Sequence, residues 1–422
     1  MKITFKLIFC ILCFSWSTNS QTLTIHHIDV GQGDATFIQV ANGKNLLIDG
    51  GDRGKGNTTV LPYLTALGVS SIDYLIASHY HSDHIGGLNE VIERLSPDSI
   101  HAFFDRGFKK PLPGSKVFAV YQSLVDRLPV HTAASPGQVI QLSNAVSLRC
   151  VASDGVTIHS DEQDGITGGE PSNDLLDEND RSLVWVMTSV HKFGQRTFTF
   201  KYFTGGDWSD TSNIALPFAI GDVDVMKVSH HGSAAATSRS LLNVLMPEAA
   251  VISVGDRNRY GHPRQQCLDC FQNTPSVQHI YQTEEGEGGW VPKVRVVGNV
   301  VVSVFDSFYV VTRDTFWLKA NTLRSVKEGR EDSRLDSGSS GSTYPSCRDE
   351  DSIPRIDVDE GGPATIKIFN ILGHVVWVRL QKNLAPGPFR LDLSPLHLPR
   401  GIYFLSMQSN SHLSVKKVVV LR

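Results

Sequence analysis

The sequence has few cysteines, no excess of positive charge and, after its first twenty residues, no long apolar run. Only six of its 422 residues are cysteine, too few for a fold held together by disulfide bonds. Lys and Arg number 39 against 43 Asp and Glu, a formal net charge of −4. This balance excludes a protein that binds nucleic acid through overall positive charge. Any contact with nucleic acid must come from a specific site.

Residues 1–20 have the pattern of a signal peptide. Lys2 and Lys6 precede an apolar run at 7–14, and small polar residues follow up to Ser20. The run is too short to span a bilayer, and no later stretch approaches the ~18 apolar residues of a membrane helix. A buried N-terminal strand is the alternative. We expect an exported protein with no transmembrane segment in the mature chain.

Residues 21–318 form one compositional block, in which short runs rich in Val, Ile, Leu and Phe alternate with Gly, Asp and Asn. Helical spacing of apolar residues appears between them, as at Leu88, Val91, Ile92 and Leu95. This mixture predicts a layered α/β domain with sheets inside. The runs of strand length lie at 23–30, 36–40, 45–48, 74–77, 183–187, 197–203, 223–228 and 250–254.

The pattern changes at 319–362, where a Ser/Gly run at 336–342 and scattered charges predict a flexible linker. Residues 363–422 return to strand-like runs separated by turn signals, which predicts a small all-β domain, a β-sandwich. This last block holds eight Lys and Arg and a single Asp. The basic end of the chain is therefore separate from the block that carries the chemistry.

The most specific feature is an H-x-H-x-D-H motif at residues 79–84, directly after the apolar run 74–77. A strand end that leads into a helix can bring imidazoles and a carboxylate into a small volume, where they are ligands for two divalent ions. Two ions about 3.5–4 Å apart generate a bridging hydroxide at neutral pH. A solvated His-rich loop is the alternative. The motif predicts a binuclear metallohydrolase.

Further polar residues follow later runs of strand length. Asp207 ends a G-G-D turn and suits a bridging carboxylate, His230 and His231 are adjacent, and His262 lies in a Y-G-H-P motif. Each alone is as consistent with an ordinary turn. Four polar clusters at strand ends of one domain indicate one site. Four histidines without a motif are expected at the surface, at positions 101, 131, 159 and 191.

The order of these motifs resembles the metallo-β-lactamase-fold hydrolases. More narrowly, the motifs D-V-G-Q-G-D-A at 29–35, N-D-R-S-L at 179–183, H-H-G-S at 230–233 and Y-G-H-P at 260–263 resemble the nuclease-like domain of ComEC-type competence proteins. The resemblance covers about residues 22–315. It implies an α/β fold, a four-layer αββα sandwich with the metals at one edge.

The resemblance also implies roles for single residues. His79 and His81 would hold the first ion, and Asp207 would bridge. The second ion would be held by Asp83, His84 and His262. Asp83 and His231 would be the catalytic pair, because Asp83 orients or deprotonates the water and His231 ligates a metal or protonates the leaving oxygen. Supporting or substrate contacts would come from Asp34, Asp49, Asn179, Lys227 and His230.

The chain departs from most of the family at residues 179–182, which read N-D-R-S where another histidine is usual. The ComEC-like branch shares this substitution, which argues against a three-histidine zinc site. That branch implies phosphodiester hydrolysis, with nucleic acid as one substrate class. Lys227, Arg181 and Arg259 are then candidate phosphate contacts. An acidic stretch at 161–180 opposes a strong grip on DNA.

The tail resembles the C-terminal sorting domain of type IX secretion, through N-I-L-G at 370–373 and L-P-R-G-I-Y at 398–403. This resemblance implies the type IX secretion machinery as a partner and delivery to the outer cell surface or the medium. A carbohydrate-binding β-sandwich is the rival interpretation.

These observations predict a secreted hydrolase with two divalent metal ions, Zn or Mn, which His and carboxylate ligands accept alike. A phosphodiesterase or nuclease fits the motifs best. The alternatives are a lactamase- or lactonase-type hydrolase of carbon esters or amides at the same metals, and a non-catalytic surface binding module.

Overall fold

The computed structural model describes residues 21–95, 99–158, 176–193, 196–209, 216 and 220–321, and the strands of the region 355–420 with a few residues beside them. The predicted signal peptide, most of the acidic stretch and most of the predicted linker lie outside the described residues. Among the helices of the described part, none is long and apolar enough to cross a membrane.

The first sheet has nine strands in the order β18-β17-β16-β1-β2-β3-β4-β5-β6. The strands β3 to β6 run parallel to one another, whereas β1, β2, β16, β17 and β18 pair antiparallel with their neighbours. The bounds are β1 Leu23–His27, β2 Thr36–Val40, β3 Asn45–Ile48, β4 Ile72–Ile76, β5 Ile100–Asp105, β6 His131–Ala133, β16 Val300–Val304, β17 Phe308–Val311 and β18 Asp314–Trp317.

The second sheet follows the order β15-β14-β13-β12-β11-β10-β8-β7, with β9 and β19 paired to its strands β8 and β11. Strands β11 to β15 are parallel. The bounds are β7 Val139–Gln141, β8 Val146–Ser153, β9 Val156–Thr157, β10 Val184–Phe193, β11 Arg196–Thr204, β12 Val225–Lys227, β13 Ala249–Ile252, β14 His279–Gln282, β15 Val294–Val296 and β19 Ala320–Asn321.

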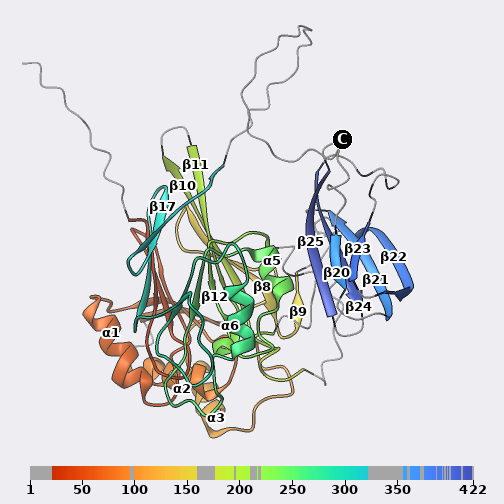
Figure 1. Ribbon diagram of the computed structural model, residues 1–422. Coiled ribbons are helices and arrows are strands. Elements are labelled where there is room, and N and C mark those ends of the chain that lie inside the picture. The colour runs from red at the N-terminus through yellow and green to blue at the C-terminus, as the bar shows by residue number, and fades with distance from the viewer. Residues whose placement is uncertain are drawn as a thin grey trace, which may run out of the picture.

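Helices cover the outer face of each sheet. The π-turn η1 (Gly56–Val60), α1 (Leu61–Ala66), α2 (Ser82–Arg94) and α3 (Lys116–Val125) pack on the first sheet, and α5 (Arg239–Leu245) and α6 (Gln265–Gln272) pack on the second. Figure 1 shows α1 on one side of the two sheets and α5 and α6 on the other. The four layers confirm the predicted αββα sandwich.

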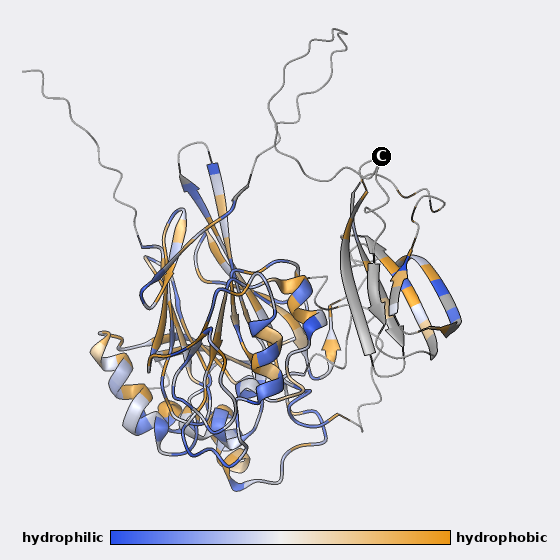
Figure 2. Ribbon diagram, in the orientation of Figure 1, coloured by the Kyte–Doolittle hydropathy of each residue, from blue (hydrophilic) through white to orange (hydrophobic). Residues whose placement is uncertain are grey.

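The strands are apolar on both faces because each sheet is covered on both sides. In β13, Ala249 and Val251 face the core between the sheets, whereas Ala250 and Ile252 pack beneath the helices of the second sheet. Such a strand appears in the sequence as an unbroken apolar run rather than an alternating one. Figure 2 shows hydrophobic residues concentrated on the central strands.

The C-terminal region is built of strands, as predicted. A four-stranded sheet has the order β22-β21-β24-β25, and β20 pairs with β23. Strands β19 and β20 and the first residue of β21 fall inside the segment predicted as a linker. The domain boundaries at 318 and 363 stay predictions. The bounds are β20 Arg355–Val358, β21 Gly362–Asn370, β22 Val375–Leu384, β23 Gly387–Arg390, β24 Gly401–Ser409 and β25 His412–Val420.

Candidate metal centre

The candidate metal centre lies where strands of both sheets end. The H-x-H-x-D-H motif follows β4, Asp207 follows β11, the turn η4 (Ser229–Gly232) follows β12 and Ser253 follows β13. Because the strands are parallel to their neighbours within each sheet, the loops after them meet at one edge, where α/β proteins bind ligands. Segments more than a hundred residues apart in the chain thus form one site.

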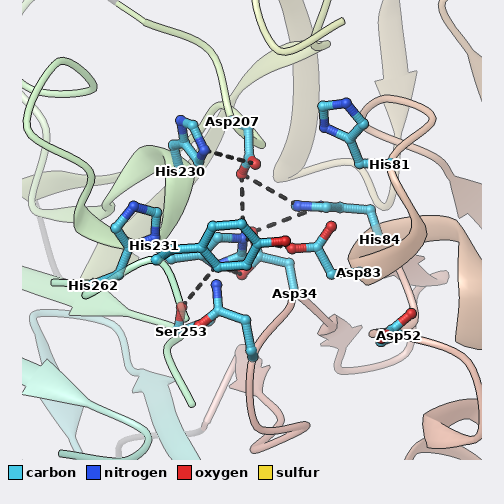
Figure 3. Close-up of polar contacts among 12 residues, drawn as sticks. Asp34, Asp52, His81, Asp83, His84, Asp207, His230, His231, Ser253 and His262 are labelled. Atoms are coloured by element: carbon cyan, nitrogen blue, oxygen red, sulfur yellow. Dashed lines mark hydrogen bonds and ion pairs between the residues drawn. The ribbon is translucent and has the colours of Figure 1, made fainter. Parts of the chain in front are cut away.

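Two groups of metal-binding side chains share one carboxylate. Asp34, His84, Asp207 and His231, all buried, place their donor atoms within 4.8 Å of one another. His79, exposed His81 and Asp207 form the second group under the same limit. Asp207 therefore lies between the two sets, the position that the sequence predicted for a bridging ligand (Figure 3).

The distances around Asp207 suit a shared cation better than hydrogen bonds. Oδ1 lies 3.3 Å from Nε2 of His84 and 3.6 Å from Nε2 of His231. Oδ2 lies 3.8 Å from Nε2 of His79. Hydrogen bonds of this kind are shorter, near 2.7–2.9 Å when charge-assisted, whereas two ligands of one tetrahedral ion, each about 2.1 Å from it, lie about 3.4 Å apart.

The buried donor atoms also need a partner. Oδ1 of Asp34, Nε2 of His84, Oδ1 of Asp207 and Nε2 of His231 are buried without a hydrogen-bond partner among the described residues. Buried polar atoms are almost always satisfied, since leaving one unpaired costs the full desolvation penalty. Four such atoms converging on one point fit a divalent cation.

The electrostatics of the cluster favour positive charge. Burial lowers the pKa of His231, but Asp207 and Asp34 outweigh it and raise this pKa to about 9. Burial likewise opposes ionisation of Asp207, yet His84 and His231 hold the pKa of its carboxyl well below the usual range. The carboxylates thus stay ionised, and the cluster attracts cations, either protons or metal ions.

A shell of hydrogen bonds orients the imidazoles. Asp49 accepts from the Ser78 amide at 2.8 Å, from the Ser78 hydroxyl at 2.6 Å and from Nδ1 of His84 at 2.8 Å. Nδ1 of His231 donates to the Ser253 carbonyl at 2.9 Å. In both histidines Nδ1 is held, so Nε2 is presented to the cluster, as is usual for metal-binding histidines.

Two glycines let the motif loops pack on one another. Gly33 has φ +136°, and a Cβ there would lie 2.4 Å from the carbonyl oxygen of Asp83. Gly232 has φ +77°, and a Cβ there would lie 2.7 Å from Cβ of Pro263. The glycines of the G-Q-G-D and H-H-G-S motifs are therefore required by close approach. They allow the loops to lie against one another.

Lys227 and Asp34 form a buried ion pair beneath the cluster, and both side chains are almost fully buried. Lys227 therefore supports Asp34 from below and is not accessible at the surface. Arg181 is also buried and pairs with Asp154 at 2.7 Å. Burial corrects the prediction that Lys227 and Arg181 contact phosphate. Arg259, the third candidate, is exposed and lies over the ring of Tyr260.

Asp83, His262 and His230 lie around the two groups without belonging to them. Asp83 is 24% exposed, and its Oδ2 lies 3.4 Å from Nε2 of His231. The ring of His262 lies 5.4 Å from that of His230 and 6.2 Å from that of His231. Nε2 of His230 lies 3.7 Å from Oδ2 of Asp207. The structure brings all three to the cluster edge, and Asp34 to its interior.

The segment that contains Asn179 packs directly behind the metal-binding loops. The backbone carbonyl of half-buried Asn179 accepts a hydrogen bond from the Ser182 amide at 3.0 Å, and Ser182 Oγ accepts one from the Asp207 amide at 3.2 Å. Among the histidines expected at the surface, His101 is exposed and His131 is half-buried. His191 is buried beside Ser189, so that expectation is wrong for it, and position 159 lies outside the described residues.

Sequence reasoning missed several supporting residues. Glu178 accepts the Tyr80 amide at 2.9 Å and two bonds from Arg106, at 3.0 and 2.7 Å. Nothing in the sequence pairs Arg106 with Glu178, which is 72 positions away. Ser78 had a signal, since it is a small polar residue placed between an apolar run and the H-x-H-x-D-H motif.

Comparison with known proteins agrees with this geometry. Residues 28–134 match the metallo-beta-lactamase superfamily. "ComE operon protein 3" of Bacillus subtilis is 25% identical over 279 residues, which are 62% of this chain and 32% of that protein. "Competence protein ComA" of Neisseria gonorrhoeae is 26% identical over 237 residues, 56% of this chain and 27% of that protein. The chain thus spans between 27% and 32% of the length of these relatives.

Among solved structures, the metallo-beta-lactamase fold protein YhfI from Bacillus subtilis aligns with a TM-score of 0.35 and 14% identity, over 64% of this chain and 99% of that chain. Residues 351–421 match the secretion system C-terminal sorting domain, which directs export to the cell surface or the medium. The chain therefore contains a metallo-β-lactamase domain related to ComE operon protein 3 and competence protein ComA, followed by a secretion sorting domain.

Proposed function

We propose that the metallo-β-lactamase domain is a binuclear metal-dependent phosphodiesterase that cleaves nucleic acid outside the cell. The observation that carries the proposal is the shared carboxylate of Asp207, whose two oxygens face different groups of donor atoms. His79 and His81 would bind one ion, and His84, His231 and Asp34 would bind the other. Compared with the ligands expected from the sequence, this set includes Asp34 and leaves Asp83 and His262 at the cluster edge.

Two divalent ions held by these residues would act as Lewis acids and activate a water near neutral pH. Asp83 is suited to orient that water and to accept its proton at a carboxylate oxygen, because it is partly exposed and adjoins His231. His231 has Nδ1 bound to a backbone carbonyl. It therefore offers Nε2 to the site, and the place of His231 among the buried donor atoms of the Asp34, His84 and Asp207 group favours a ligand role.

A phosphodiester substrate is supported by two further observations. Arg259 is exposed near the rim, where it interacts electrostatically with Asp52 and Asp83, and a guanidinium matches phosphate geometry. Two of the relatives are named as a competence protein and as "Recombination protein 2", the latter 25% identical over 273 residues. Both names suit a substrate of nucleic acid.

Metal content and hydrolysis test the proposal together. The full secreted chain would be assayed for bound Zn and Mn, then for cleavage of bis(p-nitrophenyl) phosphate, a single-stranded oligonucleotide and a chromogenic lactam. We expect two ions per chain and cleavage of the first two substrates. If the chain binds two ions but cleaves only the lactam, the proposed phosphodiesterase activity is contradicted, whereas the assignment as a hydrolase is kept. Asp207→Asn, which removes the shared charge, serves as the inactive control.

A further inference from the structure

The adjacent histidines His230 and His231 have an unusual backbone. Both are in the left-handed region, with φ 48° and 51°. This conformation is unfavourable for residues with a side chain and persists only where the surrounding structure requires it. In an extended strand, consecutive side chains point to opposite sides. Here the turn lets both imidazoles approach one buried carboxylate, that of Asp207.

The two imidazoles approach different oxygens of that carboxylate, as Figure 3 shows. Nε2 of His231 lies 3.6 Å from Oδ1 of Asp207, the oxygen that Nε2 of His84 approaches to 3.3 Å. Nε2 of His230 lies 3.7 Å from Oδ2, the oxygen that Nε2 of His79 approaches to 3.8 Å. All four separations are near the about 3.4 Å expected between ligands of one tetrahedral ion.

The group around His79 has room for one more donor. It consists of three residues, His79, His81 and the shared Asp207. A catalytic zinc ion would fill its fourth position with water, whereas an octahedral ion such as Mn²⁺ accepts a further protein ligand. The segment 179–182 supplies no imidazole, since it reads N-D-R-S. His230 reaches the same oxygen from the solvent side, where 31% of its side chain is exposed.

Backbone hydrogen bonds fix the histidine turn to the turn that carries Asp207. The amide of His230 donates to the carbonyl of Gly206 at 3.0 Å, and Gly206 directly precedes Asp207. The carbonyl of His230 accepts the amide of Ser233 at 2.8 Å. The left-handed pair is therefore held in register with the carboxylate, whatever the histidine side chains do.

We propose that this turn supplies one imidazole to each metal ion: His230 completes the ligands of the ion at His79 and His81, and His231 completes those of the ion at His84. The proposal rests on the binuclear site proposed above and adds His230 to its ligands. It explains why two consecutive residues adopt a conformation that glycine would adopt more easily.

His230→Gly tests this assignment, because glycine accepts the left-handed backbone without strain and removes only the imidazole. Binding of Mn²⁺ and Zn²⁺ to the full chain would be measured by calorimetry, and the melting temperature in EDTA and with each metal. Loss of contacts to metal-binding histidines typically costs 10–100-fold in affinity, so loss of a ligand should weaken one of the two ions by at least ~100-fold. The control is His101→Ala, an exposed histidine paired with Asp73.

The melting temperature separates ligation from folding. We expect His230→Gly to melt in EDTA at or above the wild-type temperature, and to gain less than the wild type when metal is added. Two ions bound at unchanged affinity in His230→Gly would overturn the assignment and leave the proposed function intact. A wild-type chain that binds neither metal would instead overturn the binuclear site itself.

Discussion

Lys227→Met tests the buried ion pair beneath the cluster. Lys227 and Asp34 are 2% and 3% exposed, and Lys227 donates to a carboxylate oxygen of Asp34 and to the Val228 carbonyl. Methionine keeps the length of the side chain but leaves the Asp34 carboxylate buried without its cation. Removing one partner of such a pair costs about 3–5 kcal/mol. We expect this loss in the free energy of unfolding of the metal-free protein.

Divalent metal should reduce the loss. Oδ1 of Asp34 faces the cluster without a hydrogen-bond partner among the described residues, so a bound ion would supply positive charge in place of Lys227. The variant should therefore gain more stability from Mn²⁺ than the wild type does. Asp34→Asn added to Lys227→Met should restore most of the lost stability in EDTA, since it removes the unpaired charge.

Urea unfolding followed by tryptophan fluorescence measures these differences, because Trp185 and Trp208 are buried in the same domain. The matched control is Lys319→Met, which breaks an exposed pair with Asp222 whose side chains are 65% and 43% exposed. An exposed pair contributes about 0–1 kcal/mol. If Lys227→Met in EDTA costs no more than Lys319→Met, the reasoning from burial is refuted.

Three further predictions concern the site and the tail. Asp83→Ala should abolish hydrolysis while circular dichroism stays unchanged, and retained turnover would remove Asp83 from the mechanism. Asp49→Asn should weaken metal binding about 10–100-fold, since it disturbs the bonds to Ser78 and His84, and calorimetry giving wild-type affinity would count against it. Deletion of residues 351–422 should keep the enzyme in the periplasm with its activity intact, and fractionation that finds it in the medium would disprove the sorting role.

The local part of the site was predictable from the sequence. The H-x-H-x-D-H motif brings its own ligands together, because a strand end and the first turn of α2 hold them within six residues. The G-G-D turn that ends at Asp207 and the H-H-G-S turn each follow an apolar run, so their place at a strand end could be predicted. The mixture of apolar runs and helical spacing predicted a layered α/β domain, whereas the four layers were implied by the resemblance to the metallo-β-lactamase-fold hydrolases.

What the chain alone could not decide is which motif meets which. Asp34 pairs with Lys227 across 193 positions, and Arg106 pairs with Glu178 across 72. The sequence does not distinguish a buried Lys or Arg from an exposed one. Lys227 and Arg181 were therefore predicted to contact phosphate, although both are buried.

Composition determined that the chain folds as an α/β domain with a separate β-rich tail, and short motifs determined which residue types could hold metal. Only the tertiary structure decided that Asp34 joins the cluster while His262 stays at its edge. The physical reason is that burial and the packing of two sheets against each other set the distances between donor atoms. Neither quantity is encoded by any one segment of the chain.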